Sequence, residues 1–459
     1  MFEDRLKALD RAHLIHSVTN FRDHERTGVS ILDKGTGAYL IDSNGNQLLD
    51  AFSGLWCVNI GYGQESVVRA AAEQMSRLPY ATTYFGFGSE AAIRLATKLA
   101  ERAPGNLDHI YFTQGGSDSV DSAIRYITHY FNAKGQPQKK QFIALERGYH
   151  GTSSIGSGLT GLSAFHTNFD VPLANQHHIP SPYPYRHPLG DDPEALISDS
   201  VQSLRDKVTE LGAENVAAFF CEPVQGSGGV IVPPPGWLKA ISTACKELDI
   251  LLVVDEVITA FGRTGPLFAS STEGVVPDII TVAKGLTAGY APMGAMIFSS
   301  DIYNTIADNC PADKPVGHGT TYSAHPVSAA IGLEVLRLYE EGGLLENGAR
   351  VTPRFEQGLQ KLRDHPLVGD VRQRGLLGAL ELVADKRTKR RFDSSLKLSS
   401  RVQASGYEHG LIFRAFADNI LGFAPALCYT ASEMDELFEK LRRTLDAILD
   451  EIDVRASVA

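Results

Sequence analysis

Short, wholly apolar segments alternate with helical stretches along the middle of this chain, and this pattern restricts the fold more than any other feature. Six segments are predicted to be buried strands: 109–113, 141–146, 216–223, 250–257, 278–283 and 294–300. Strands that are apolar on both faces are typical of mostly parallel sheets, which helices cover on both sides. The pattern therefore predicts an α/β fold with a mostly parallel central sheet.

The two ends of the chain differ from this central pattern. Residues 30–50 alternate apolar and polar positions around Ser-Asn-Gly-Asn, which indicates a β-hairpin. The last helix is predicted to begin with a capping box from Thr430 to Glu433. Its buried face carries apolar residues at helical spacing: Leu437, Leu441, Ile448 and Ile452. We therefore predict a large domain and a smaller α+β domain built from both termini, with the boundaries 60–325 for the first, and 1–59 and 326–459 for the second.

Composition and charge exclude several classes of protein. A net charge of −11 over 459 residues does not suit a nucleic-acid binder, which needs a basic face. No apolar run approaches the roughly 20 residues that span a bilayer, and the N-terminal stretch lacks the apolar core of a secretory signal. The five cysteines are scattered and form no CxxC pair, which is typical of reduced thiols. We expect a cytoplasmic enzyme with neither nucleic-acid nor membrane partners.

Three ionisable residues stand at the ends of apolar strands, where burying a charge is unfavourable. Lys284 directly follows the fifth predicted strand, and Asp255 and Glu256 lie near the end of the fourth. Lys284 is either a surface lysine or an amine shielded from water, whose pKa falls so that it becomes a nucleophile. Asp255 is either a helix cap, a salt-bridge partner of Arg263, or a carboxylate that keeps a cofactor nitrogen protonated.

A Gly-Gly turn separates a strand from a helix within residues 111–131. The helix is predicted to begin near Ser117, so the backbone amides at its start would form an anion site suited to phosphate. The alternative is a tight strand–helix turn with a serine N-cap. The spacing differs from GxxxxGK[ST], which argues against a nucleoside-triphosphate loop.

Two further strand ends carry side chains that suit a cofactor. Tyr149 follows the strand 141–146, where its ring would either stack on a flat cofactor or pack in the core. Glu222 and Gln225 follow the next strand. Open α/β sheets bind ligands at the carboxyl ends of their strands, so these residues are expected near Lys284. A phosphate cradle, a stacking ring, a carboxylate and an amine are together what pyridoxal phosphate requires.

At these residues the chain resembles the class III (omega) aminotransferases, which are pyridoxal-phosphate enzymes of fold type I. The resemblance covers almost the whole chain, and its most specific segments are EPVQGSGG (222–229), LLVVDEVITAFGRTG (251–265) and AKGLTAGYAPMGA (283–295). It implies that pyridoxal 5′-phosphate is the cofactor and that Lys284 forms a Schiff base with it and later moves the proton. Asp255 would pair with the protonated ring nitrogen of the cofactor.

The resemblance also implies the remaining cofactor contacts. They are Gly116 and Ser117 at the phosphate, Tyr149 and Val257 on the two faces of the ring, Glu222, and Thr321. Thr321 would reach the phosphate from the neighbouring subunit, so a homodimer with active sites at the interface is implied, and a tetramer is left open. The chain has Gly115 and Asp118 where many relatives have serine and glutamate, so the complete set of phosphate ligands also stays open.

Two features narrow the substrate class. The segment 55–63 is similar to the amine:pyruvate subgroup, in which the substrate pocket would be lined by Trp56, Tyr84, Phe85 and Tyr149. Ornithine-type relatives carry an arginine at the position of Gly422, whereas here Arg414 matches the mobile arginine of amine:pyruvate enzymes. That arginine would pair with an α-carboxylate through two hydrogen bonds and move aside for amines that lack one.

The implied reaction moves an amino group from an amine or omega-amino acid to pyruvate, giving an aldehyde or ketone and alanine. Other reactions on the same scaffold remain open: a 2-oxoglutarate-dependent aminotransferase, an aminomutase or a decarboxylating aminotransferase. A non-catalytic cofactor-binding regulator is disfavoured because no basic recognition helix is visible. A nicotinamide-dependent dehydrogenase is disfavoured because no GxGxxG opens a βαβ unit. The preferred amine and its handedness are not predicted.

Histidine pairs and one cysteine were the other candidates for chemistry. His13 and His16 have HxxH spacing, and His177 and His178 are adjacent, but no third ligand is evident for either pair. We therefore expect surface roles for them and no metal site. Cys57, beside the predicted pocket tryptophan, is expected to pack rather than to react because no partnered base is evident.

Overall fold

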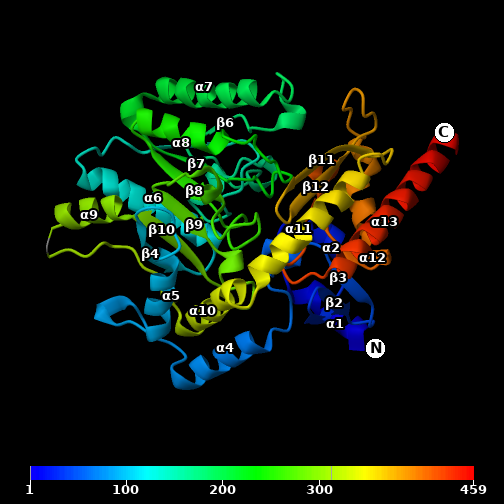
Figure 1. The fold of residues 1–459 in the computed structure, drawn as a ribbon, viewed down its shortest axis with the longest axis horizontal. Coiled ribbons are helices and arrows are strands. Elements are labelled where there is room, and N and C mark those ends of the chain that lie inside the picture. The colour runs from blue at the N-terminus through cyan, green and yellow to red at the C-terminus, as the bar shows by residue number, and fades with distance from the viewer. Residues whose placement is uncertain (1, 312, 459) are drawn as a thin grey trace.

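The computed structural model describes residues 2–311 and 313–458, and a large sheet forms its centre (Figure 1). Within the described residues its strands are, in spatial order, β4 (Leu107–Thr113), β10 (Gly294–Ser299), β9 (Ile279–Val282), β8 (Leu251–Asp255), β7 (Val216–Cys221), β5 (Gln141–Leu145) and β6 (Gln176–Ile179). Neighbours are parallel from β9 to β6, whereas β10 is antiparallel to both of its neighbours. The predicted mostly parallel sheet is confirmed. Strand β6 is not among the six predicted strands, because its Gln-His-His-Ile sequence contains no apolar run.

Helices cover both faces of this sheet because successive residues of its strands point to opposite sides. Phe219 of β7 packs in one cluster with Trp237, and the next residue, Phe220, packs in another cluster with Phe131. The first face carries α7 (Pro193–Leu211) and α8 (Trp237–Glu247), and the second carries α6 (Gly116–Ala133) and α9 (Ser300–Asn309). Three further helices pack together near β4, namely α4 (Glu65–Arg77), α5 (Glu90–Ala100) and α10 (Pro326–Glu340).

Two smaller sheets are formed by the two ends of the chain. One contains β1 (Leu32–Thr36), β2 (Tyr39–Asp42), β3 (Gln47–Asp50) and β13 (Leu411–Ile412). The other contains β11 (Val368–Arg374), β12 (Leu377–Leu382), β15 (Ile420–Phe423) and β14 (Arg414–Phe416). The predicted hairpin is confirmed as the antiparallel pair β2–β3. Strand β13 pairs in parallel with β3 and so joins the two ends, while the predicted domain boundaries stay a prediction.

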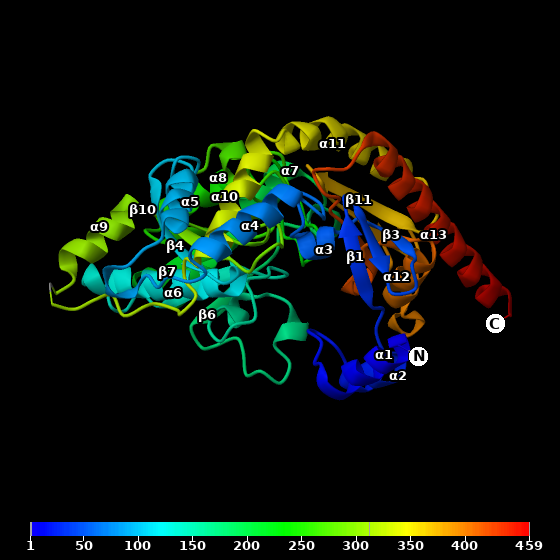
Figure 2. The same cartoon turned by 90° about the horizontal axis from the view of Figure 1, so that it is seen from below.

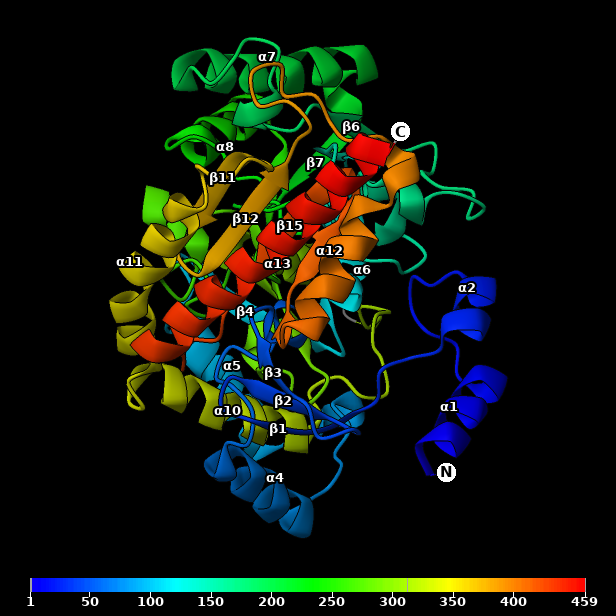
Figure 3. The ribbon, with the colours of Figure 1, turned by 90° about the vertical axis from the view of Figure 1, so that its right-hand side faces the viewer.

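The terminal helices lie at the outside of the molecule. They are α1 (Phe2–His13) and α2 (Phe21–Thr27) at one end, and α11 (Leu344–Lys361), α12 (Leu398–Glu408) and α13 (Ala431–Val458) at the other (Figures 2 and 3). The capping box is confirmed, because the Thr430 amide donates to a Glu433 carboxylate oxygen at 2.7 Å and the Glu433 amide donates to Thr430 Oγ1 at 3.2 Å. Among the described residues, no helix has both the length and the apolarity to cross a bilayer.

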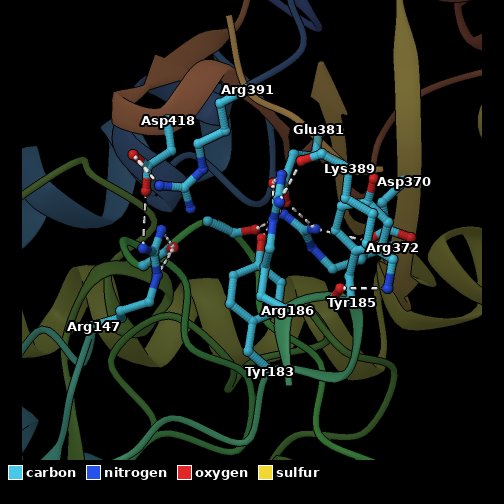
Figure 4. A network of polar contacts seen from close by, with 12 residues as sticks. Arg147, Tyr183, Tyr185, Arg186, Asp370, Arg372, Glu381, Lys389, Arg391 and Asp418 are labelled. Atoms are coloured by element: carbon cyan, nitrogen blue, oxygen red, sulfur yellow. Dashed lines mark hydrogen bonds and ion pairs between the residues drawn. The ribbon is translucent and has the colours of Figure 1, made fainter. Parts of the chain in front are cut away.

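A buried ionic network connects the β11–β12 hairpin to the central part of the chain (Figure 4). Glu381 of β12 is fully buried and accepts hydrogen bonds from Arg372 at 2.9 Å, from Arg186 at 2.8 Å, and from the Tyr183 hydroxyl. Burial alone would raise the pKa of Glu381, but Arg372 and the two other donors lower it overall. The carboxylate is therefore ionised and fully paired; it is the counter-ion of Arg186, and it shares Arg372 with Asp370.

A second ion pair in the same region joins the loop after β5 to the segment after β14. Arg147 donates to Asp418 at 2.9 Å, and Arg391 donates to the other oxygen of the same carboxylate at 3.0 Å (Figure 4). Arg147 also donates to the carbonyl oxygen of Gly228 at 2.8 Å. These contacts fix the C-terminal strands against the carboxyl edge of the central sheet.

Replacing Glu381 with glutamine is expected to destabilise the protein by about 3–5 kcal/mol, because Arg186 loses its counter-ion and the buried charge of Arg372 keeps only Asp370 as a partner. Urea unfolding at fixed protein concentration measures the effect. The matched control is Glu439→Gln, since Glu439 pairs with Arg443 on the exposed face of α13; that change is expected to alter stability by less than about 1 kcal/mol. Equal losses in the two variants would contradict the importance of the buried network.

Candidate active site

A cavity of about 390 Å³ opens at the carboxyl ends of the parallel strands. Seven residues singled out from the sequence line it: Gly116, Ser117, Tyr149, Glu222, Asp255, Val257 and Lys284. They lie at the carboxyl ends of five strands of the central sheet, namely β4, β5, β7, β8 and β9. The structure thus brings together residues up to 168 positions apart in sequence, from Gly116 to Lys284. This is the edge at which open α/β sheets bind ligands.

Lys284 stands just after β9, and its side chain borders the cavity. Burial lowers the pKa of Lys284, and the negative charges of Asp255 and Glu222 oppose that shift. Among the described residues, no hydrogen bond or ion pair holds its Nζ atom, which lies 5.8 Å from the centre of the Trp56 ring. The backbone of Lys284 has a φ of 30°, a strained conformation for a side chain of this size. The amine is therefore available to a ligand in the cavity.

Asp255 ends β8 and is paired with a histidine rather than with Arg263, which was one of the alternatives considered for it. Its Oδ2 atom lies 2.9 Å from Nδ1 of His150, and its Oδ1 atom accepts the Val257 amide at 3.1 Å. Because a carboxylate only accepts, Nδ1 of His150 carries the proton. Arg263 is also buried, but it donates to four other acceptors: the carbonyl oxygens of Leu376 and Pro425, and the side chains of Ser53 and Asn59. The salt bridge to Arg263 considered for Asp255 is absent from the described contacts.

The neighbouring carboxylate, Glu256, faces away from this histidine. It accepts the backbone amides of Ala269 at 2.6 Å and Ser270 at 2.9 Å, together with the hydroxyls of Ser270 and Thr259. Its hydrogen-bonding capacity is used within the core, and it does not border the cavity. Successive residues at the end of a strand point to opposite sides. Glu256 therefore stabilises the core, whereas Asp255 borders the cavity.

His150 is a site residue that the sequence did not reveal. It is buried, it borders the cavity, and among the described residues its Nε2 atom is buried without a hydrogen-bond partner. Its neighbour Tyr149 was singled out as a ring that could stack, but nothing in the sequence connects a histidine at 150 to a carboxylate 105 residues away. The histidine orients Asp255 through this contact and can stabilise its charge.

Helix α6 begins at the cavity and leaves backbone donors directed at it. Its N-cap is Gly115, and within the described chain no side chain caps this end, so the serine-cap alternative does not apply. A Cβ atom at Gly116 would approach the Val257 side chain to 3.0 Å, so a larger residue at this turn would crowd Val257. Ser117 contributes a hydroxyl that accepts the Thr152 amide at 3.3 Å. Free amides at the start of an 18-residue helix are suited to a phosphate.

Glu222 lines the cavity together with Tyr149. Its two oxygens accept the backbone amides of Tyr149 at 2.9 Å and Gly226 at 3.0 Å. Burial raises the pKa of Glu222 to about 7, with His150 opposing and Asp255 adding to the shift. The Tyr149 ring meets Phe165 edge-on, with 5.3 Å between ring centres, and keeps one face toward the cavity that it lines.

Arg414 and Trp56 lie just outside this lining and are connected by an aromatic ring. Trp56 is buried and stacks on Phe416, with ring centres 5.8 Å apart, and the Arg414 guanidinium lies 5.9 Å from the same Phe416 ring. Arg414 pairs with Gly422 across β14 and β15. A Cβ atom at Gly422 would come within 2.3 Å of the Phe416 ring, so this position has no room for a side chain. Phe416, like His150, was not predicted.

The other three predicted residues, Thr321, Tyr84 and Phe85, lie away from the cavity. Phe85 is 87% exposed and Tyr84 is 43% exposed, and Thr321 is exposed as well. They form one surface cluster with Tyr80, whose hydroxyl donates to the carbonyl oxygen of Thr321 at 2.9 Å. In the described chain these residues do not border the cavity of the same subunit, and their predicted roles stay predictions.

Comparison with known proteins agrees with this architecture. The class III aminotransferase family model matches residues 21–445. The putrescine–pyruvate aminotransferase of Pseudomonas aeruginosa is 40% identical over 442 residues, which is 96% of this chain and 95% of the relative. An (S)-enantioselective omega-transaminase from Thermomicrobium roseum aligns with a TM-score of 0.93 at 39% identity, over 97% of this chain and 99% of that one. The Pseudomonas jessenii omega transaminase in complex with PMP has a TM-score of 0.95 at 36% identity, over 98% and 99%.

The fold and the site define a pyridoxal-phosphate enzyme of fold type I. The chain belongs to the class III aminotransferases, and it is a pyridoxal 5′-phosphate-dependent transaminase. The residues present fit this cofactor: an unpaired amine of lowered pKa, an uncapped helix start, a carboxylate held by a histidine, and an aromatic ring border one cavity.

The raised pKa of Glu222 predicts a stability effect that depends on pH. The folded protein holds the proton of Glu222 up to about pH 7, whereas the unfolded chain releases it near pH 4.5. The group therefore contributes stability that is full below pH 4.5 and is lost as the pH rises through 7, by up to about 3 kcal/mol.

The cofactor-free protein is compared with Glu222→Gln by urea unfolding between pH 4.5 and 8. The difference, wild type minus variant, is expected to fall across this interval, whereas Glu439→Gln on exposed α13 gives a flat difference. The variant also leaves one backbone amide without its acceptor, but that loss does not vary with pH. A flat profile for Glu222→Gln would contradict the raised pKa.

Proposed function

We propose that this aminotransferase moves an amino group from an amine or omega-amino acid to pyruvate, giving an aldehyde or ketone and alanine. The observation that carries the proposal is the arrangement of Arg414, Phe416 and Gly422 beside Trp56. The only predicted carboxylate partner, Arg414, is exposed on β14, and Phe416 occupies the space that a side chain at 422 would need. A single arginine that can move suits both substrates. It would bind the carboxylate of a monocarboxylic keto acid and move aside for an amine that has no carboxylate.

Each cavity residue has a distinct role in the proposed reaction. When bound, the cofactor carries the substrate nitrogen and withdraws electrons from the carbon that reacts. The amine of Lys284, whose pKa burial lowers, would take the proton from that carbon and return it to the adjacent carbon of the cofactor. Asp255 would keep the ring nitrogen of the cofactor protonated, and His150 holds this carboxylate in place.

The remaining residues bind and orient rather than react. The amides at Gly116 and Ser117 would hold the phosphate, and Tyr149 and Val257 would enclose the ring from opposite faces. Glu222 fixes the backbone of Tyr149 and so the position of its ring. The substrate side of the site would be lined by Trp56, whose own ring is kept in place by Phe416.

We also propose a homodimer in which each subunit completes the other's site. An exposed aromatic cluster supports this: Tyr80, Tyr84, Phe85, Phe87 and Tyr322 are 41 to 87% exposed. Large exposed apolar patches are typical of protein interfaces. The cluster adjoins Thr320, whose hydroxyl accepts a hydrogen bond at 2.7 Å from Gln114, a residue that lines the cavity. Thr321 and Phe85 would thus serve the cavity of the second copy. The cytoplasmic location stays a prediction.

Other class III reactions are the nearest alternatives. A 2-oxoglutarate-dependent enzyme would need a partner for a second carboxylate, but position 422, where ornithine-type relatives carry an arginine, holds a glycine next to the Phe416 ring. An aminomutase or a decarboxylating aminotransferase differs in its products, since simple transfer consumes one keto acid for each amine. The membership of this chain in the class III aminotransferases argues against a non-catalytic regulator.

Lys284→Ala is expected to reduce turnover by roughly a thousand-fold or more, because no other amine borders the cavity within the described chain to move the proton. Alanine formation from pyruvate and an amine measures the effect. Lys361→Ala, on the exposed end of α11, is the matched control and is expected to keep full activity. Near-normal transamination by the Lys284 variant would contradict the assignment of Lys284 as the amine that moves the proton.

Arg414→Ala is expected to affect the two halves of the reaction unequally. Loss of a charged hydrogen-bonding partner should lower kcat/KM for pyruvate by roughly 10- to 100-fold, whereas kcat/KM for an amine without a carboxylate should change little. Single-turnover measurements of each half separate the two. Arg414→Lys, which keeps the charge but not the planar fork, should give an intermediate loss for pyruvate. Equal losses in both halves would reject the role of Arg414.

A further inference from the structure

Three metal-ligating side chains meet in the N-terminal segment, outside the site described above. Asp10 lies in the last turn of α1, His16 in the following loop, and His24 in α2. Nε2 of His16 lies 2.7 Å from Oδ1 of Asp10, and Nε2 of His24 lies 3.0 Å from Oδ2. The three ligand atoms lie within 4.8 Å of one another. The sequence suggested His13 as the partner of His16, but the structure brings Asp10 and His24 to it instead.

The geometry at His24 is not that of an ordinary ion pair. Although His24 Nε2 and Asp10 Oδ2 are 3.0 Å apart, both atoms are buried and neither has a hydrogen-bond partner among the described residues. The imidazole nitrogen is thus close to the oxygen without being directed at it. Such a pair is left unsatisfied unless a third atom binds to both, and leaving buried polar atoms unsatisfied is unfavourable.

We propose that Asp10, His16 and His24 bind a divalent transition-metal ion, with zinc as the best match. Two imidazoles and one carboxylate suit zinc, which takes nitrogen ligands at about 2.0–2.1 Å and oxygen ligands at about 2.0–2.2 Å. Two such ligands at a tetrahedral angle lie roughly 3.4 Å apart. The observed separations of 2.7 and 3.0 Å reach that value with shifts of less than 1 Å. A water molecule would complete the coordination.

The surrounding structure gives the metal a physical role. Helices α1 and α2 project from the main body as a separate two-helix arm (Figures 2 and 3). Helix α2 contains no buried residue, and the linker between the helices exposes Leu14 at 59% and Ile15 at 78%. An arm with so little apolar core has little intrinsic stability. An ion bound by residues of both helices and their linker would hold the arm in one conformation, since metal binding is coupled to folding.

The test uses the full-length protein with its cofactor, washed with a chelator and then titrated with zinc in equilibrium dialysis. We expect one zinc ion per chain, with affinity at least about tenfold lower in His24→Ala and in Asp10→Asn. His13→Ala is the matched control, because His13 is exposed at the end of α1 and outside the cluster, and it should bind zinc like the wild type. Cofactor absorbance verifies that every variant is folded.

Limited trypsin digestion provides a second readout of the arm itself. Zinc is expected to slow cleavage after Arg11 and Arg22 in the wild type and in His13→Ala, but not in His24→Ala. If the wild type retains no zinc, or if His24→Ala binds zinc as tightly as the wild type, the proposal is overturned, and the three residues form only a hydrogen-bonded cluster. Neither result depends on which amine the enzyme uses.

Discussion

The burial of one amine at the end of β9 is the constraint on which the site depends. Desolvation lowers the pKa of Lys284, and its backbone is held at a strained φ of 30°. Strain of this kind persists only where the surroundings enforce it. The buried Tyr339 of α10 does so by donating to the carbonyl oxygen of Gly285 at 2.7 Å, and the Leu286 amide closes the turn onto Ala283. A helix beyond the central sheet thus fixes the reactive residue.

The two halves of the site are held by different parts of the chain. The edge of the central sheet positions the residues around the cofactor, whereas the C-terminal strands carry Arg414 and Phe416 on the substrate side. Arg147 connects the halves, since it precedes Tyr149 by two residues and donates to Asp418, which follows Arg414 by four. The buried pair of Arg372 and Glu381 anchors the same strands. Substrate recognition therefore depends on contacts between distant segments.

The sequence predicted those parts of the structure that local patterns determine. Apolar strands, the β2–β3 hairpin and the capping box at Thr430 are local signals, and polar residues at the ends of parallel strands were expected to meet. It did not predict His150, Phe416 or the meeting of Asp10 with His24, because each depends on a partner distant in space or on the path of a loop. The sequence also offered Arg263 as a partner for Asp255. In the structure Arg263 is buried and donates instead to the carbonyl oxygens of Leu376 and Pro425.

The visible absorption spectrum of the purified protein tests the central claim most directly. The account predicts a cofactor band that disappears when an amine without a carboxylate is added and returns with pyruvate, as alanine forms. A band that responds only to α-amino acids would contradict the proposed donors and leave the cofactor site intact. A protein without any cofactor band, even after incubation with pyridoxal 5′-phosphate, would contradict the account of Lys284 itself.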